Sequence, residues 1–280
     1  MLCILFKGFS HRAQGASHIA KNLPCQDNAK HYESSNLGIA VVSDGHGSEK
    51  HFRSAIGSKI ATEISIQAIK DFIARENDYI DAIVSDVDKI LKQLESNIIY
   101  RWNEAVYKHL TENPEVTEEE KLLYGDVDLK IGTRVYGATL IAAVITEKYW
   151  FVLQIGDGAC VTVIDTETAK ILVPEDERLV FGFTTSLCDS NAIDNFRHYF
   201  HEISEETPMP LGLIVSSDGL VDSYESDVFL GFNCKMLNTF SSQDITSEEI
   251  ETFLLSISEK GSKDDISVAG IYFKPDDTAC

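Results

Sequence analysis

The strongest constraint on the fold comes from strand-like segments that are apolar on both faces. In ATLIAAVIT (138–146), alternate positions carry Leu, Ala and Val on one face and Ile, Ala and Ile on the other. Segments 151–155 and 213–215 are also apolar at every or nearly every position. A sheet built from such strands must be covered on both faces.

The connections between these segments are too short to supply that cover by crossover helices. Turn-like residues at 146–147, 156–158 and 166–167 separate successive strand segments, which favours antiparallel hairpins. Two packed sheets, each with helices on its outer face, satisfy both requirements. We therefore expect an α+β fold, a four-layer α-β-β-α sandwich of two antiparallel sheets flanked by helix pairs.

Periodicity and turn signals place the individual elements. We expect strands at 29–33, 37–43, 136–145, 149–155, 159–165, 170–173, 211–217 and 266–273. We expect helices from about residue 48, with an apolar stripe at every fourth position from 52 to 72, and at 79–110, 227–239 and 247–260. The polar stretch 112–125 is expected to be a surface excursion. No repeat or linker divides the chain, so we expect one domain over 1–280.

The chain has a net charge of −21, from 24 Lys and Arg against 45 Asp and Glu. Such a surface repels nucleic acid and anionic membranes, because both present phosphates. It would also repel a phosphorylated substrate unless a bound cation reverses the local field. No apolar run reaches the ~18 residues of a membrane helix. The six cysteines form no C-x-x-C pair, so we expect free thiols and a cytoplasmic location.

Carboxylates stand next to several of the apolar strands. They are Asp27, Asp44, Asp157, Asp218 and the pair Asp264-Asp265. Asp-Gly is also an ordinary turn signal, and that alternative applies to each position taken alone. Together, carboxylates at so many buried strand ends favour a metal site, because each is costly to bury without a partner. Oxygen ligands without a cysteine or histidine cluster indicate Mg²⁺ or Mn²⁺ rather than zinc.

Six segments resemble the PPM metal-dependent phosphatases, also called type 2C protein phosphatases, in a bacterial-type subgroup. They are CQDN (25–28), VVSDGHGS (41–48), GATL (137–140), IGDGA (155–159), SSDGLVDS (216–223) and KDDISV (263–268). Their order follows the family from near Gly15 to Phe273. The resemblance implies the same sandwich and hydrolysis of phosphoserine and phosphothreonine on proteins. Water bridging two metal ions would attack, without a covalent intermediate.

The resemblance also implies a cofactor of two Mn²⁺ or Mg²⁺ ions. Asp44 would bridge both ions, and the Gly45 carbonyl would complete the second. Asp218 and Asp264 would hold the first ion. Asp27 would lie behind these ligands and accept hydrogen bonds from water on the ions.

Three further positions match family residues with other roles. His46 matches the histidine proposed as general acid to the leaving alkoxide. Asp157 and Asp222 match positions that bind a third, weaker metal in some members.

Two departures from the family pattern affect these expectations. Gln26 precedes Asp27 where many members have glutamate, so a charged ligand to the second metal becomes a neutral amide. The usual phosphate-binding arginine is also absent, and the nearest cations, His18 and Lys21, are the candidates for substrate binding. The subgroup's G-x-S-H and C-Q-D patterns match here, so we interpret both departures as subgroup features.

Alternative functions remain open. A catalytically weak or silent homologue could act as a phosphoprotein-binding or regulatory module, which Gln26 favours and the retained Asp44 and His46 oppose. A small phosphate ester is an alternative substrate. No cysteine is followed by Arg six positions later, which excludes a cysteine-nucleophile phosphatase. We expect a monomer that acts on phosphoproteins, paired with a serine/threonine kinase, and that binds neither nucleic acid nor membrane.

Overall fold

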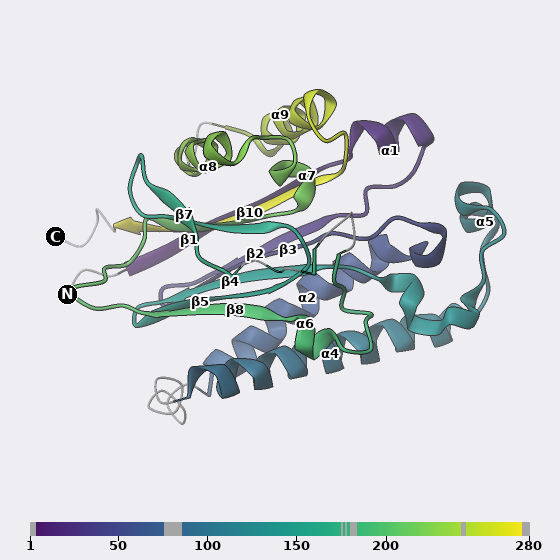
Figure 1. Ribbon diagram of the computed structural model, residues 1–280, viewed down its shortest axis with the longest axis horizontal. Helices are drawn as coiled ribbons and strands as arrows, with labels where there is room; N and C mark the ends of the chain where they lie inside the picture. The colour runs from purple at the N-terminus through teal and green to yellow at the C-terminus, as the bar shows by residue number, and fades with distance from the viewer. Residues whose placement is uncertain are drawn as a thin grey trace.

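The computed structural model describes residues 4–75, 86–174, 176, 178–179, 184–241 and 245–275. Its strands form two antiparallel five-stranded sheets, ordered β2-β3-β4-β5-β8 and β1-β10-β9-β6-β7 (Figure 1). The first sheet comprises β2 (Asn28–Glu33), β3 (Leu37–Ser43), β4 (Leu140–Thr146), β5 (Tyr149–Ile155) and β8 (Arg197–Glu202). The second comprises β1 (Ile4–Ala13), β6 (Ala159–Val163), β7 (Ala169–Ile171), β9 (Gly212–Ser216) and β10 (Ile266–Pro275).

Helices cover the outer face of each sheet (Figure 1). The long helices are α2 (Ser54–Ile73) and α4 (Val87–Glu112) on the first sheet, and α8 (Ser226–Phe240) and α9 (Ser247–Lys260) on the second. Short helical segments are α1 (Ala16–Lys21), η1 (Glu49–His51), α5 (Glu118–Tyr124), η2 (Leu129–Tyr136), α6 (Ala192–Asn195) and α7 (Asp218–Val221). The expected α-β-β-α sandwich is confirmed.

Three apolar layers explain why the central strands are apolar on both faces. One face of β4, with Leu140 and Val144, packs against α2 and α4. The opposite face, with Ile141 and Ile145, meets residues of the second sheet such as Val215 between the sheets. A third cluster joins the second sheet to α8 and α9. Removing these faces from water is the main stabilisation of the sandwich.

The expected stripe of apolar residues is only part of the buried face of α2. The helix begins at Ser54, after the separate turn η1, and buries mainly small side chains. A Cβ atom on Gly57 would lie 1.8 Å from the backbone oxygen of Tyr136. The helix therefore approaches η2 so closely that only small residues fit, and the larger Ile56 and Ile60 are partly buried beside them.

Two strands were not predicted. β1 pairs with β10 along its whole length, from Ile4 to Ala13, although its second half is rich in polar residues. β8 is a half-buried edge strand of sequence RHYFHE. Its His198 Nδ1 lies 2.8 Å from a carboxylate oxygen of the buried Glu95 of α4. Long-range pairing, not local pattern, stabilises both strands.

The polar stretch 112–125 contains a helix. Thr117 and Glu120 form a reciprocal capping box at the start of α5, each side chain accepting a hydrogen bond from the other's backbone N–H. Residues 79–85 of the expected second helix lie outside the described residues. Of the six cysteines, four lie in the described chain and all four are free thiols, as expected.

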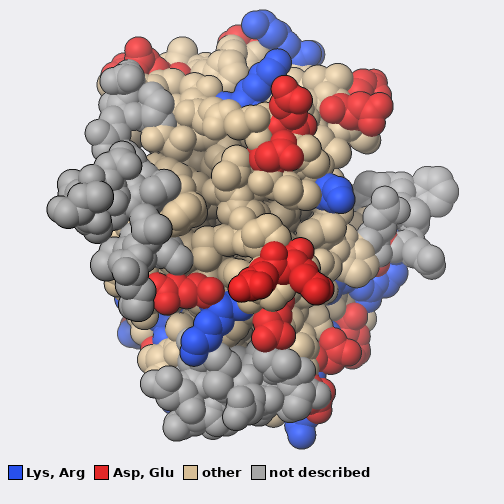
Figure 2. Space-filling view, turned by 90° about the vertical axis from the view of Figure 1, so that its left-hand side faces the viewer, with Lys and Arg blue, Asp and Glu red and all other residues tan. Residues whose placement is uncertain are grey.

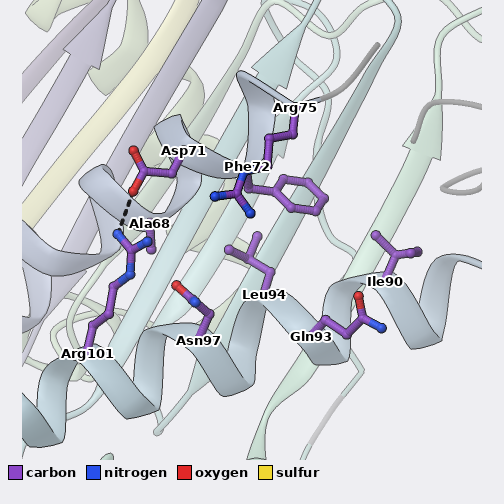
Figure 3. A pocket seen from close by; sticks show the side chains of 9 residues that line it. All are labelled: Ala68, Asp71, Phe72, Arg75, Ile90, Gln93, Leu94, Asn97 and Arg101. Carbon is purple, nitrogen blue, oxygen red and sulfur yellow. Dashed lines mark hydrogen bonds and ion pairs between the residues drawn. The ribbon is translucent and has the colours of Figure 1, made fainter. Parts of the chain in front are cut away.

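A pocket of about 230 Å³ lies between α2 and α4 (Figure 3). An ion pair of 2.7 Å between Arg101 and Asp71 links the two helices at this pocket. No helix among the described residues has the length and hydropathy that a bilayer crossing would require.

The strand registers bring the predicted site residues to one end of the sandwich. Asn28 pairs with Ser43, so Asp27 and Asp44 lie together. Ala13 pairs with Ile266, which places Asp264 at the same end, while the chain termini lie at the other (Figure 1). The face at the terminal end carries several acidic clusters, with Lys and Arg side chains scattered among them (Figure 2).

Candidate metal centre

Three aspartates from both sheets form the centre of the site. One carboxylate oxygen from each of Asp44, Asp157 and Asp218 lies within 4.8 Å of the others. Asp44 follows β3, Asp157 lies in the turn between β5 and β6, and Asp218 begins α7 after β9. The sandwich thus gathers three of the carboxylates that we expected at strand ends.

Backbone contacts hold these aspartates in place. The Asp44 N–H donates to Thr139 Oγ1 at 3.0 Å, and the Thr139 N–H donates to the Asp44 carbonyl at 2.8 Å. Before Asp157, Gly156 has a φ of +109°, a backbone conformation that favours glycine. A Cβ atom there would also lie 2.5 Å from the Thr139 side chain.

Burial and mutual repulsion dominate the electrostatics of the cluster. Burial, followed by repulsion from Asp27 and Asp218, raises the pKa of Asp44 well above its usual value. Burial and Asp157 raise the pKa of Asp218 to about 6. Asp44 and Asp218 also share a hydrogen bond between their carboxyl groups. Charging all three carboxylates so close together is costly without a cation between them.

Asp27 lies behind this cluster and is 1% exposed. Burial, then repulsion from Asp265, raises its pKa to about 7, while hydrogen bonding from Ser217 lowers it. Its Oδ2 is buried and has no hydrogen-bond partner within the described part of the chain. A buried acceptor without a donor is rare, and it fits a ligand or water held by the site.

Asp265 is a site residue that the sequence analysis missed, because it assigned a role only to the neighbouring Asp264. It is 3% exposed, and its two carboxylate oxygens accept hydrogen bonds of 2.6 Å from the N–H groups of Gly15 and Gln26. It also contacts His18 Nδ1 at 2.9 Å, and this hydrogen bond is the main cause of the raised pKa of His18. The Asp-Asp pair was the available signal, but which aspartate turns inward depends on the packing of Gly15.

The other predicted site residues lie around the three central aspartates. Asp264 is exposed, and its Oδ1 accepts a hydrogen bond of 2.8 Å from the Asp265 N–H. Asp222 is also exposed. Neither belongs to the close group, but repulsion from Asp264 contributes to the raised pKa of Asp157, Asp218 and Asp222. Lys21 is exposed in the last turn of α1.

His46 lies next to the cluster, two residues after Asp44. Burial, with a smaller effect of His51, lowers its pKa to about 4. The two imidazole rings are edge to face, with centroids 5.0 Å apart. The intervening Gly45 is buried and forms a β-bridge with Ala138.

Gln26 is buried against α5 rather than exposed. Its Nε2 donates a hydrogen bond of 2.8 Å to the Tyr124 hydroxyl. Its Oε1 has no hydrogen-bond partner among the described residues and lies where a Cβ atom on Gly47 would stand. Packing against α5 is therefore one physical reason for a neutral amide at this position.

Two arginines near the site were missed by the sequence analysis. Arg12 in β1 donates a hydrogen bond of 2.8 Å to the Asp27 carbonyl. Arg197 in β8 donates to the Gly156 carbonyl, and its charge partly offsets the burial that raises the pKa of Asp157. Both lie on strands that we did not predict, so their approach to the aspartates could not be inferred.

The residues present fit a divalent cation. Close carboxylates with raised pKa values and a buried acceptor without a donor form a site that positive charge would stabilise. Ligand carboxylates must lose their protons to bind a metal, so binding releases protons.

We expect Mn²⁺ to bind more tightly as pH rises. The raised pKa values mean that protons are held below about pH 6–7, where they compete with the metal. The half-saturating Mn²⁺ concentration should fall about tenfold per pH unit between pH 5 and 6 for each proton released, and level off above pH 7. Calorimetric titration in buffers of different ionisation enthalpy measures both the Mn²⁺ affinity and the number of protons released. An affinity independent of pH over this range would contradict the carboxylate site.

Comparisons with known proteins place this geometry in a family. The sequence profile described as "Protein phosphatase 2C" matches residues 14–255. No curated protein sequence matches the chain. Solved structures with the same fold include a bacterial serine phosphatase, at 16% identity and a TM-score of 0.58, covering 98% of this chain and 100% of that one.

Two named bacterial phosphatases are also similar. One is the catalytic domain of the serine/threonine phosphatase PstP in complex with two manganese ions, at 14% identity and a TM-score of 0.54, covering 96% of this chain and 99% of that one. The other is Stp1 from Staphylococcus aureus, at 15% identity and a TM-score of 0.57, covering 98% of this chain and 96% of that one. With the profile match over most of its length, the chain belongs to the protein phosphatase 2C (PPM) family of serine/threonine phosphatases.

Proposed function

We propose that this protein hydrolyses phosphoserine and phosphothreonine on proteins in a metal-dependent reaction. The observation that carries the proposal is the group formed by Asp44, Asp157 and Asp218, backed by the partnerless Oδ2 of Asp27. Family membership supports the reaction class. Burying three like charges together destabilises a fold, so their presence at the ends of three strands indicates a functional site.

The cofactor we propose is a pair of Mn²⁺ or Mg²⁺ ions. Bound divalent ions lower the pKa of water and offset the charge of the phosphate group. Asp44 lies centrally enough to serve two ions, and the nearby Asp218 and Asp157 would share them. In the family pattern Asp264 holds the first ion and Asp222 a weaker third one, and the repulsion that both exert on Asp218 is consistent with these roles. Manganese in the PstP complex supports the choice of metal.

The remaining site residues would act on protons and on substrate. Asp27 would accept hydrogen bonds through its free Oδ2 and orient the attacking water. His46 would donate a proton to the leaving alkoxide. Its pKa of about 4 leaves it neutral in the free protein at pH 7, so it would take up the proton as the phosphate dianion approaches. Lys21 is the remaining candidate for phosphate binding, since His18 is held by Asp265.

The alternative of a catalytically silent homologue rests on Gln26. Its Nε2 donates to the Tyr124 hydroxyl, so the amide has a packing role that does not depend on loss of activity. The silent homologue therefore loses its main support, and we propose an active enzyme whose counterpart is a protein serine/threonine kinase.

The decisive experiment is hydrolysis with and without metal. We expect phosphoserine and phosphothreonine peptides, and p-nitrophenyl phosphate, to be hydrolysed only with added Mn²⁺ or Mg²⁺. EDTA should abolish the activity, because the site offers hard oxygen ligands and no alternative catalyst. Undiminished hydrolysis in EDTA would overturn the mechanism. Binding of a phosphopeptide without any turnover in Mn²⁺ would instead support the silent homologue.

A further inference from the structure

A largely apolar pocket, with two basic residues among those that line it, lies beside the candidate general acid. Its volume is about 250 Å³, and it is lined by Lys50, His51, Ile131 and Arg134. Lys50, Ile131 and Arg134 are exposed, so a bound partner could reach them. The proposed function above assigns no role to any of these residues.

The backbone connects this pocket to the aspartates. Segments 44–51 and 134–139 lie side by side, through Asp44 with Thr139, Gly45 with Ala138, His46 with Gly137, and His51 with Arg134. In the last of these contacts, His51 Nδ1 lies 2.6 Å from the Arg134 carbonyl oxygen. The same pair of segments therefore begins at the metal centre and ends at the pocket.

Gly137 packs against both His46 and the pocket residue His51. A Cβ atom on Gly137 would lie 2.4 Å from His51 Nδ1 and 2.8 Å from His46 Cδ2. The glycine allows the two rings to pack against the backbone and against each other. A substrate whose leaving group meets His46 would therefore bring its neighbouring residues to the pocket.

The charge of the pocket is opposite to that of the chain. The net charge is −21, yet neither Lys50 nor Arg134 forms an ion pair with any residue that the structure describes. Asp189, whose charge affects the neighbouring His51, accepts hydrogen bonds from the Ser186 N–H and from Asn195. The opposite end of the molecule instead carries acidic clusters (Figure 2). Two free cations at the catalytic end are available to an anionic ligand.

We propose that this pocket binds an anionic side chain of the substrate, next to the phosphorylated residue. The enzyme would then prefer phosphoserine and phosphothreonine flanked by Asp or Glu, or by a second phosphorylated residue. Lys50 and Arg134 supply the charge, and Ile131 packs against the methylene groups of the bound side chain. This inference rests on the proposed function.

The test is a set of matched phosphopeptides. A phosphoserine is flanked on both sides by Ala, by Glu, by Lys or by a second phosphoserine, and kcat/KM is measured for each in Mn²⁺. We expect the Glu peptide to exceed the Ala peptide by about three- to tenfold, the scale of one or two exposed ion pairs. Salt at 0.5 M should reduce the difference. Net charge alone predicts the reverse order, because an acidic protein repels an acidic peptide.

Substitutions in the pocket test whether it is the source of the preference for the Glu peptide. We expect the ratio of kcat/KM for the Glu and Ala peptides to fall to about one in the double variant Lys50→Ala, Arg134→Ala. The double reversal Lys50→Glu, Arg134→Glu should favour the Lys peptide. The matched control is Lys235→Ala, an exposed lysine on α8 over the other sheet, which should keep the wild-type ratio.

Each outcome decides between the two proposals. Equal hydrolysis of the Ala, Glu and Lys peptides would overturn the inference and leave the phosphatase function intact. A preference that Lys235→Ala reduces as much as the double variant does would also overturn it. If no peptide is hydrolysed, the proposed function fails, and fluorescence anisotropy with the same peptides still tests the pocket. Equal dissociation constants for the Glu and Ala peptides would then overturn the proposed binding of an anionic side chain in the pocket.

Discussion

Asp44→Asn should reduce turnover of both phosphopeptide and p-nitrophenyl phosphate by at least about 10³-fold, because it removes a charge that the metal ions would share. Asp44 is the aspartate whose neighbours include Asp27, Asp157 and Asp218. Steady-state assays over a wide range of Mn²⁺ concentrations measure the loss. Near-normal activity in this variant would show that the metal centre is assigned incorrectly.

The same substitution should stabilise the metal-free protein. The pKa of Asp44 in the folded protein is well above its value in the unfolded chain. The stability that its protonated form contributes is fully present below about pH 4 and is lost as pH rises through the folded-state pKa. Once the pH exceeds that pKa, the charged carboxylate destabilises the metal-free fold, and asparagine removes that charge. The melting temperature in EDTA should rise by about 2–4 °C for each kcal/mol regained.

This pair of measurements separates a role in catalysis from a role in folding. A variant that is inactive but more stable without metal has lost its function and kept its fold. The matched control is Asp165→Asn, in the turn after β6, where the carboxylate accepts hydrogen bonds from the N–H groups of Glu167 and Thr168 and lies at the other end of β6 from Asp157. It should leave turnover unchanged. A fall in melting temperature for Asp44→Asn would mean that the carboxylate is needed for folding.

The parts of the fold that could be predicted are those encoded by local pattern. The strand β4, predicted at 136–145 and observed at Leu140–Thr146, could be recognised because both of its faces are apolar, and this property required two helix layers and two sheets. Asp44 and Asp218 could be associated because each directly follows an apolar strand of the kind that lies at the centre of a sheet.

The parts that could not be predicted depend on contacts between distant segments. β1 is stabilised by its register with β10, which no pattern within residues 4–13 reveals. Asp265, not Asp264, turns inward because it meets the N–H groups of Gly15 and Gln26, about 240–250 positions away in the sequence. The small buried face of α2 follows from its close approach to Tyr136. Tertiary packing overrides local preference in each case.

His46→Gln should slow cleavage of a phosphoserine peptide on the order of 10²–10⁴-fold, and cleavage of p-nitrophenyl phosphate far less. A general acid matters most when the leaving group is a strong base, and a serine alkoxide is much more basic than nitrophenolate. His46 lies between Asp44 and the pocket, so its ring would be next to the leaving side chain of the substrate. Measuring kcat for both substrates gives the two losses directly.

The low pKa of His46 means that its proton must come with substrate binding. With a pKa of about 4, the imidazole is neutral in the free enzyme at pH 7 and must gain its proton when the substrate anion binds. A phosphate dianion beside the ring favours the imidazolium, because opposite charges within a few ångströms raise the pKa of a base. The matched control is His31→Gln, a half-buried histidine of β2 that contacts Ser10 Oγ at 3.0 Å, and it should affect neither substrate selectively. Equal losses on both substrates in His46→Gln would instead assign this ring a structural role, since only proton transfer to the leaving oxygen distinguishes an alkoxide from a nitrophenolate.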